Sequence, residues 1–225
     1  DTALAVMSKM HRQIYDYFRQ QFAQVTNPPI DSLREASVMS LETCYGPELN
    51  VFDETPDHAK RLVTTSPVLS FKKLQSVINN KHFSNIEIDL EYAKSTSLKK
   101  ALKKLQKDVV NEVKNGKVII HLVEKVPNKD HLPINALLAV GCVHQKLVSL
   151  GLRSDANIVI STSSARDTHQ IACLIGFGAT AVYPSLAYQT ILDLSDRNEI
   201  KGVPHENCAR YRKGVNKGLL KIISK

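Results

Sequence analysis

The sequence has 225 residues, of which 43% are hydrophobic and 23% are charged, and its formal net charge is +8 at pH 7. This balance is typical of a globular protein and excludes an intrinsically disordered chain. No apolar run approaches the roughly 20 residues that span a bilayer, and the first residues lack the pattern of a signal peptide. We therefore expect a globular core of one domain or two small ones, with a cytoplasmic location and no membrane partner.

The cysteines give no sign of a metal site or a disulfide framework. They are widely spaced and form no CxxC pair, and two of them lie inside apolar segments, where cysteine behaves as a small hydrophobic residue. The four positions are Cys44, Cys142, Cys173 and Cys208. This usage favours a reducing compartment.

The positive charge is concentrated in residues 94–117, which could suggest nucleic-acid binding. The apolar residues of this stretch fall on one helical face and its lysines on the other, which is the pattern of a helix docked on a core. No aromatic residues alternate with the lysines to stack on bases, and the chain has no tryptophan. We therefore expect a solvated basic face and no nucleic-acid partner.

The first part of the chain differs in pattern from the rest. Apolar residues at spacings of three and four predict one amphipathic helix over residues 4–22, ending before Pro28 and Pro29. Residues 24–60 contain five prolines or glycines and little periodicity, which predicts a long irregular segment of functional interest. We expect residues 1–60 to be a helix and a proline-rich connection that form one structural unit with residues 61–225.

The remainder alternates between strand and helix patterns. We expect strands at residues 61–69, 86–92, 118–123, 157–161 and 180–183. We expect helices at residues 71–79, 96–115, 133–150, 166–175, 186–194 and 206–223. Asn115 and Gly116 form a helix C-cap before the apolar, β-branched run 118–123, which is typical of a strand buried on both faces. Strand and helix in strict succession predict an α/β fold with a parallel sheet and right-handed crossovers.

The segment 176–181, GFGATA, fits the GxGxxA variant of the dinucleotide-binding fingerprint. That motif needs a strand before the glycines and a helix after them, so that the pyrophosphate meets the helix N-terminus. Here a helix pattern comes first and a strand pattern follows. We therefore interpret the glycines as a helix C-cap and a tight turn into the sheet.

Residues 161–169 follow a predicted strand and lead into a helix, which is where α/β sheets bind ligands. Hydroxyl groups and a helix N-terminus suit an anion, so one hypothesis is an anion-binding site. The candidate residues are Ser163, Ser164, Arg166 and His169. The alternative, which the residues favour, is a helix N-cap in which Ser163 or Ser164 accepts backbone hydrogens and Asp167 complements the helix dipole.

No complete catalytic constellation is evident from residue types and spacing. The eight histidines show no metal-ligand spacing such as HExxH, and no serine lies in a GxSxG elbow. Glu87, Asp89 and Glu91 alternate along a predicted strand, which is more typical of a solvated strand face than of a paired catalytic site. We therefore expect no catalytic residues and no metal in this chain.

Several runs, in the same order from end to end, resemble the central domain of glutamate synthase. The first is YFRQQFAQVTNPPID at residues 17–31, continued by LRE at 33–35 and VMSL at 38–41. The second comprises ARDTH at 165–169, LIGFGATAVYP at 174–184 and LAY at 186–188. The last, GVNKGLLKIISK at 214–225, resembles the junction that leads into the flavin domain of that enzyme.

This resemblance implies a parent oxidoreductase that hydrolyses glutamine in an amidotransferase domain and passes ammonia to a flavin-mononucleotide (FMN) barrel, where 2-oxoglutarate becomes glutamate. It implies an iron-sulfur cluster, NADPH or ferredoxin as electron donor, and a small subunit if the enzyme is of the NADPH type. Those sites belong to segments outside these residues, so no cofactor is expected here. The central domain itself is implied to be an incomplete TIM-barrel-like (β/α) domain, preceded by the N-terminal helix and irregular loop. The uncapped chain ends also suggest neighbouring domains on both sides.

The resemblance also implies a role for one proline-rich loop, as a lining of the ammonia tunnel. Its residues are Gln24, Val25, Thr26, Asn27 and Pro28. A hydroxyl and an amide can hold and pass a small neutral polar molecule, and prolines reduce the entropy lost in ordering the loop. The alternative is a rigid turn in which these side chains only cap local backbone.

This sequence departs from the family pattern at several positions. Ser32 stands where the family usually has proline, the run 168–170 replaces a common double histidine, and Ser161 stands where an acidic residue is frequent. A rival function is an independent module that binds a small anionic metabolite at residues 161–169.

Overall fold

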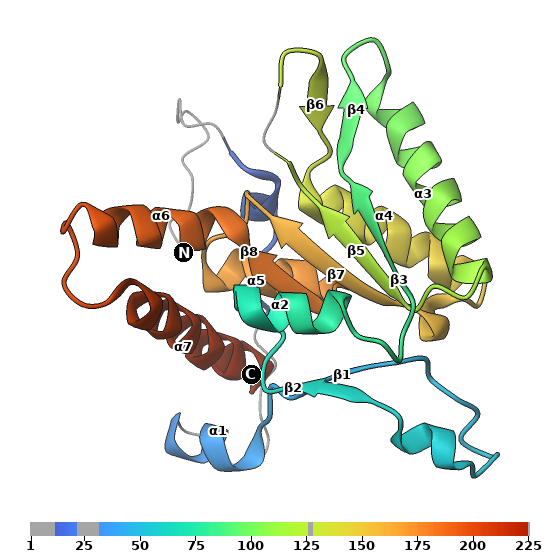
Figure 1. Cartoon of the computed structure of the whole chain (residues 1–225), viewed down its shortest axis with the longest axis horizontal. Coiled ribbons are helices and arrows are strands. Elements are labelled where there is room, and N and C mark those ends of the chain that lie inside the picture. The colour runs from blue at the N-terminus through green and yellow to red at the C-terminus, as the bar shows by residue number, and fades with distance from the viewer. Residues whose placement is uncertain (1–11, 22–31, 126–127, 225) are drawn as a thin grey trace.

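The structure is a computed structural model that describes residues 12–21, 32–125 and 128–224. Its centre is a four-stranded parallel sheet with flanking helices, accompanied by two small antiparallel pairs (Figure 1). The strands are β1 (Thr43–Tyr45), β2 (Leu62–Thr64), β3 (Asn85–Asp89), β4 (Glu91–Ala93), β5 (Ile119–Val123), β6 (His131–Pro133), β7 (Asn157–Thr162) and β8 (Ala181–Pro184). The expected α/β class with a parallel sheet is confirmed.

The helices connect and cover these strands. The α-helices are α1 (Ser32–Val38), α2 (Phe71–Ile78), α3 (Leu98–Lys114), α4 (Ala136–Ser149), α5 (Thr168–Gly176), α6 (Ser185–Asp196) and α7 (Pro204–Ile223). Three short 3₁₀ helices are η1 (Ile14–Tyr17), η2 (Pro56–Ala59) and η3 (Arg153–Asp155).

The parallel sheet has the strand order β3-β5-β7-β8, so each strand lies beside the next parallel strand along the chain. The crossovers between them contain α3, α4 and α5 in turn. In this register Glu87 lies opposite His121, and Leu122 lies opposite Ile160. Because parallel partners point to the same side, the register divides the strand residues into two faces.

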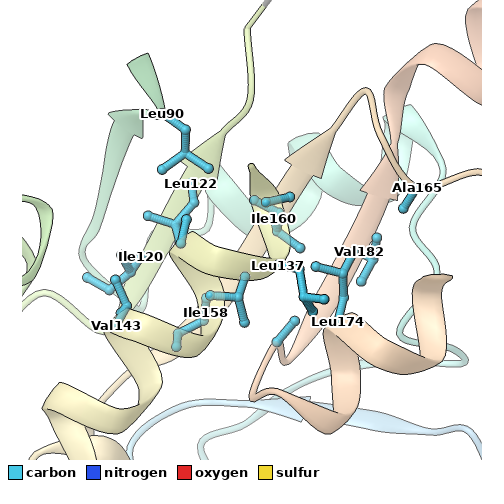
Figure 2. Close-up of a cluster of buried hydrophobic side chains, with 14 of the residues drawn as sticks. Leu90, Ile120, Leu122, Leu137, Val143, Ile158, Ile160, Ala165, Leu174 and Val182 are labelled. Atoms are coloured by element: carbon cyan, nitrogen blue, oxygen red, sulfur yellow. The ribbon is translucent and has the colours of Figure 1, made fainter. Parts of the chain in front are cut away.

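One face of the sheet is almost entirely apolar and packs against α3, α4 and α5. Its fully buried strand residues are Ile120, Leu122, Ile158, Ile160 and Val182. Leu137 and Leu174 from the covering helices pack onto them (Figure 2). The apolar stripe of α3, which the lysine-rich sequence pattern predicts, is buried in the same cluster.

The opposite face is smaller and mixed in character. Ile119, Val159 and Ala181 pack against α2 and against Tyr45 of β1 in a second apolar cluster. The same face carries the polar side chains of Glu87 and His121, in register with Val159. The antiparallel pair β1–β2 lies on this side and connects to the rest of the chain through α2.

Most expected elements after residue 70 are confirmed, with boundaries shifted by a few residues. These are α2, α3, β5, α4, β7, α5, β8, α6 and α7. The predicted turn at residues 115–116 is also confirmed, since Asn115 ends α3 and Gly116 has a φ of 83°, which suits glycine.

The prediction of a long N-terminal helix is wrong for residues 12–21, the part of it that the structure describes. Residues 12–21 contain only the 3₁₀ helix η1, and Phe18 is extended with φ −103° and ψ 142°. Tyr15 is fully buried, and the rings of Phe18 and Phe177 meet edge to face at 4.9 Å. These tertiary contacts override a local helical periodicity. Residues 4–11 and residue 22 lie outside the described ranges.

Other differences concern short strands. The expected strand over residues 61–69 is reduced to β2, and beyond it Val68 forms only an isolated parallel bridge with Val182 of β8. The expected strand over residues 86–92 divides into β3 and β4 at the buried Leu90. The helix expected from residue 133 begins at 136, since β6 occupies the preceding residues and pairs with β4. The described part of the irregular segment contains α1, β1 and η2.

Candidate functional site

The carboxyl ends of β5 and β7 meet at a buried carboxylate. Glu124, directly after β5, is only 8% exposed. Its Oε2 atom accepts bonds from the Thr162 hydroxyl at 2.6 Å and from the Ser163 and Ser164 backbone N–H groups at 3.0 and 3.1 Å. The Ser164 hydroxyl adds a fourth bond at 3.0 Å. The serine-rich turn therefore binds an anion, and that anion is supplied by the protein itself.

Tyr15 connects the N-terminal segment to this turn. Its hydroxyl lies 3.1 Å from the Ser164 hydroxyl, and its backbone carbonyl accepts a bond from His169 Nε2 at 2.9 Å. Burial raises the pKa of the Tyr15 hydroxyl to about 12, so the group stays neutral at physiological pH. Residues 12–18 are thus fixed at the carboxyl edge of the sheet.

The first turn of α5 is capped by Asp167. Its Oδ1 atom accepts a bond from the Gln170 backbone N–H at 2.8 Å. A capped helix N-terminus is present as expected, but the assignment of Ser163 or Ser164 as the cap is wrong: the cap is Asp167, and the serines bind Glu124. The difference arises because α5 begins at Thr168, a few residues after Ser163 and Ser164.

The four candidate anion-binding residues are not brought together around one open position. Ser163 and Ser164 face Glu124, while His169 Nε2 donates to Tyr15. Arg166 is exposed, and its carbonyl accepts a bond from the Tyr211 hydroxyl at 2.9 Å. An external anion at the serines would have to displace the Glu124 carboxylate. Binding at this turn is therefore still a prediction.

Sequence reasoning did not find Glu124 or Tyr15. Glu124 is 38 residues before Thr162 in the chain, and the two meet only because β5 and β7 are neighbours. The available signal was an acidic residue directly after an apolar strand, beside a serine-rich turn that follows the next strand. The buried Tyr15 has no comparable signal, since it lay within an apparent amphipathic helix.

A second polar chain crosses the mixed face of the sheet. His121 Nδ1 lies 3.1 Å from Glu87 Oε2, and His121 Nε2 lies 2.7 Å from the Ser161 hydroxyl. Burial lowers the pKa of His121, and the nearby Glu87 opposes this shift only partly. The neutral ring then donates from Nδ1 to Glu87 and accepts at Nε2 from Ser161.

The order carboxylate, imidazole and hydroxyl is that of a nucleophilic triad. His121 and Ser161 are only 4% and 6% exposed, so a substrate does not reach the hydroxyl in this conformation. We interpret these two hydrogen bonds as a structural link between the strands β3, β5 and β7. The solvated-face interpretation of the strand carboxylates is confirmed for Glu87 and Asp89, which are both exposed. Glu87 also contacts His121, and Asp89 also contacts Lys125 at 2.5 Å.

The glycine segment after α5 acts as the sequence pattern indicates. Helix α5 ends at Gly176, Gly178 has a φ of 113°, and β8 begins at Ala181. A Cβ atom at Gly178 would approach His144 Nδ1 to 2.3 Å. The helix-cap interpretation is confirmed, because the order is helix, turn and strand rather than the reverse.

In the described ranges no three His, Cys, Asp or Glu side chains are placed to hold a metal ion. The four cysteines are unpaired, and burial raises the pKa of the Cys173 thiol to about 11. Iron-sulfur clusters need several thiolates at one place, and these thiols do not provide that. No helix among the described residues is long and apolar enough to cross a membrane. Residues 24–28, the predicted tunnel lining, lie outside the described residues.

These features define an α/β domain in which a buried carboxylate of the protein closes the edge where ligands usually bind. The sequence profile described as the glutamate synthase central domain matches residues 1–225, and the chain belongs to this family.

Three relatives cover 100% of this chain. The ferredoxin-dependent glutamate synthase 2, chloroplastic, of Arabidopsis thaliana is 38% identical over 241 residues. The glutamate synthase [NADPH] large chain of Azospirillum brasilense is 36% identical over 229 residues, and the glutamate synthase [NADH] of Saccharomyces cerevisiae is 32% identical over 240 residues. The chain spans 15%, 15% and 11% of these proteins respectively.

Among solved structures, the YdjI aldolase of Escherichia coli K12 is similar over 70% of this chain and 65% of its own, with 12% identity. Its TM-score of 0.26 is too low to support any conclusion about fold or function.

Proposed function

We propose that this chain links the glutamine amidotransferase domain to the FMN domain of a glutamate synthase and helps to form the ammonia tunnel between them. The observation that carries the proposal is the family match over residues 1–225, combined with the 15% of the Arabidopsis relative that the chain covers. On this proposal the catalytic groups belong to the other domains of the parent enzyme. This chain holds those domains in place and forms part of the passage for ammonia.

Contacts at the carboxyl edge of the sheet support a role for the loop Gln24–Pro28. Tyr15 bonds to Ser164 and His169, so residues 12–18, which precede the loop in the sequence, have a defined position at this edge. The Thr26 hydroxyl and the Asn27 amide have the chemistry to pass neutral ammonia without protonating it. Gln24, Val25 and Pro28 complete the proposed lining.

The finer assignments of the parent enzyme belong to the same proposal. It would carry FMN and an iron-sulfur cluster, act in the cytoplasm and, if of the NADPH type, bind a small subunit. The names of the relatives include ferredoxin, NADH and NADPH forms, so they favour no single electron donor. The strand order β3-β5-β7-β8 with α3, α4 and α5 on one face supports an incomplete β/α barrel. We also propose that residues 1–60 form a connecting segment and residues 61–225 the α/β domain, as one structural unit.

The channelling role is tested by Thr26→Val and Asn27→Leu in the full-length enzyme. We expect each variant to hydrolyse more glutamine per glutamate formed, because ammonia would escape before it reaches the flavin site. The measurement is the ratio of the two products under conditions where both reactions are saturated. Thr190→Val on α6 is a matched control, since Thr190 is exposed and bonds only to the Leu186 carbonyl among the described residues. An unchanged ratio in both loop variants would contradict the channelling role.

A further inference from the structure

The segment between β1 and β2, residues 46–61, forms an arm that projects from the body at the lower right of Figure 1. It begins at Gly46, whose φ of 137° is a backbone conformation that side chains rarely adopt. A Cβ atom there would lie 3.1 Å from both the Arg61 and Phe83 side chains. Glycine at position 46 therefore fixes the point at which the arm leaves the β1–β2 pair.

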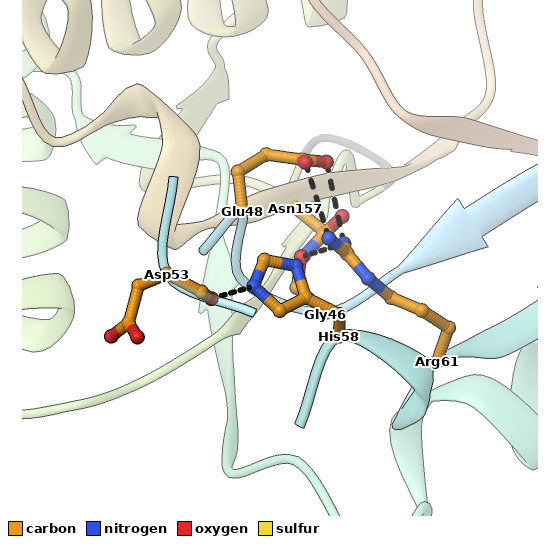
Figure 3. Close-up of polar contacts among 6 residues, drawn as sticks. All are labelled: Gly46, Glu48, Asp53, His58, Arg61 and Asn157. Atoms are coloured by element: carbon orange, nitrogen blue, oxygen red, sulfur yellow. Dashed lines mark hydrogen bonds and ion pairs between the residues drawn. The ribbon is translucent and has the colours of Figure 1, made fainter. Parts of the chain in front are cut away.

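Polar contacts hold the base of the arm in one conformation (Figure 3). Arg61 donates to both carboxylate oxygens of Glu48 at 3.3 and 3.1 Å and to the Gly46 carbonyl at 3.1 Å. The Asn157 amide, from the start of β7, donates to the same carbonyl at 3.2 Å. The Glu48 backbone N–H donates to the Ser154 carbonyl at 2.8 Å. The arm is thus tied to the parallel sheet.

The tip of the arm is ordered by further bonds. His58 Nε2 donates to the Asp53 carbonyl at 2.9 Å, which connects the two sides of the arm (Figure 3). Asn50 accepts bonds from the backbone N–H groups of Phe52, at its side chain, and Asp53, at its carbonyl. The residues of the tip are therefore held before any partner arrives, which reduces the entropy lost on binding.

This ordered tip presents two large apolar side chains to solvent. Phe52 is 94% exposed and Val51 is 78% exposed, the two highest values among the exposed large hydrophobic residues of the described chain. A hollow of about 470 Å³ beside them is lined by Val51, Glu54, Thr55, Pro56 and His58. Large apolar side chains that become buried at the centre of a contact are typical of an interface hot spot.

The charges around the tip indicate what the partner surface must offer. Asp53 and Glu54 follow Phe52 and form no ion pair with any described residue. Arg61 and Lys60 of the same arm are paired with Glu48 and Asp57. The tip is therefore apolar with a negative rim, although the chain as a whole has a net charge of +8.

We propose that the arm inserts Val51 and Phe52 into an apolar pocket with a basic rim on another domain of the same polypeptide. The proposal rests on the proposed place of this chain within a glutamate synthase, since the chain covers only 11–15% of the three relatives described above. The rest of such a polypeptide is covalently attached, so its effective concentration exceeds that of any free partner.

Radical footprinting of the full-length enzyme tests this directly. Oxidation of Phe52 and Val51 by hydroxyl radicals is measured by mass spectrometry in the native and the denatured enzyme, at several protein concentrations. We expect the native enzyme to protect Phe52 several-fold, to the same extent at every concentration. Phe52 that oxidises as fast in the native as in the denatured enzyme would overturn the proposal. Protection that disappears on dilution would assign the site to a second copy and would also overturn it.

A substitution gives a second readout that does not depend on oxidation chemistry. Phe52→Ser should release the arm in the full-length enzyme, so that trypsin cleaves after Lys60 or Arg61 several-fold faster. Phe71→Ser is the matched control, since Phe71 is an exposed phenylalanine on α2, away from the arm. Equal cleavage rates in the wild type and in Phe52→Ser would contradict the docking. The arm could prove fully exposed in an enzyme that still couples glutamine hydrolysis to glutamate synthesis. That result would overturn the docking proposal and leave the proposed linking role intact.

Discussion

The two faces of the parallel sheet are built from different chemistry, although the same strands supply both. One face buries Ile120, Leu122 and Ile160 against three helices, and its side chains are almost all apolar. The other carries the chain Glu87–His121–Ser161 beside a smaller apolar cluster. The apolar face gains stability from area and close packing, whereas the mixed face depends on hydrogen bonds whose partners are few and specific. The comparison predicts different responses to substitution and to pH.

The largest loss is expected from the apolar face. Leu122→Ala removes a fully buried side chain from a packed cluster, and the cavity that remains should lower the free energy of unfolding by about 2–5 kcal/mol. Leu132→Ala on β6 is the matched control, because Leu132 is 37% exposed and should cost about 1 kcal/mol or less. Denaturant titration followed by circular dichroism gives both values. Equal losses in the two variants would contradict the assignment of this face as the main core.

A smaller loss is expected at the carboxyl edge. Glu124→Ala leaves the Ser163 and Ser164 backbone donors without their acceptor and should lower the free energy of unfolding by about 1–3 kcal/mol. Glu199→Ala is the control, since Glu199 is an exposed partner of Arg197 and such pairs contribute about 0–1 kcal/mol.

The same variant tests the anion hypothesis for this turn. With Glu124 removed, inorganic phosphate should raise the melting temperature of Glu124→Ala and have little effect on the wild type, whose donors are already bonded. Phosphate that stabilises the wild type as strongly as the variant would show that the carboxylate does not occupy the anion position.

The mixed face should make stability depend on pH. Because the pKa of His121 is lower in the folded than in the unfolded protein, the folded state binds fewer protons over that window. The free energy of unfolding should therefore fall as the pH drops below about 6.5, the ordinary pKa of histidine, towards the lower folded value. His121→Gln should flatten this dependence, and exposed His205→Gln should not. A wild type that gains stability on acidification through this range would contradict the account.

The contrast between the faces also explains what could be predicted from sequence. The helices α3 and α4 and the strands β5 and β7 have long periodic or β-branched patterns, and the sequence placed them to within a few residues. The helix pattern before residues 176–181 and the strand pattern after them likewise identified the glycines as a helix cap and turn.

Contacts between distant residues could not be predicted in this way. Glu124 meets the turn after β7, and His121 meets Ser161 forty residues later, only through the strand order of the sheet. The N-terminal helix failed for a related reason. Ile14 and Phe18 have helical spacing, but burial of Tyr15 beside Ser164 selects a different backbone. Local patterns determine elements, whereas the site depends on which elements become neighbours.

We propose that this domain lies on the route of ammonia through a larger enzyme. An experimental structure of the full-length polypeptide, with the internal passage traced between the amidotransferase and flavin sites, tests it most directly. We expect a continuous passage in contact with Thr26 and Asn27. A passage that avoids residues 24–28, or the absence of any connection between the two sites next to this domain, would contradict it.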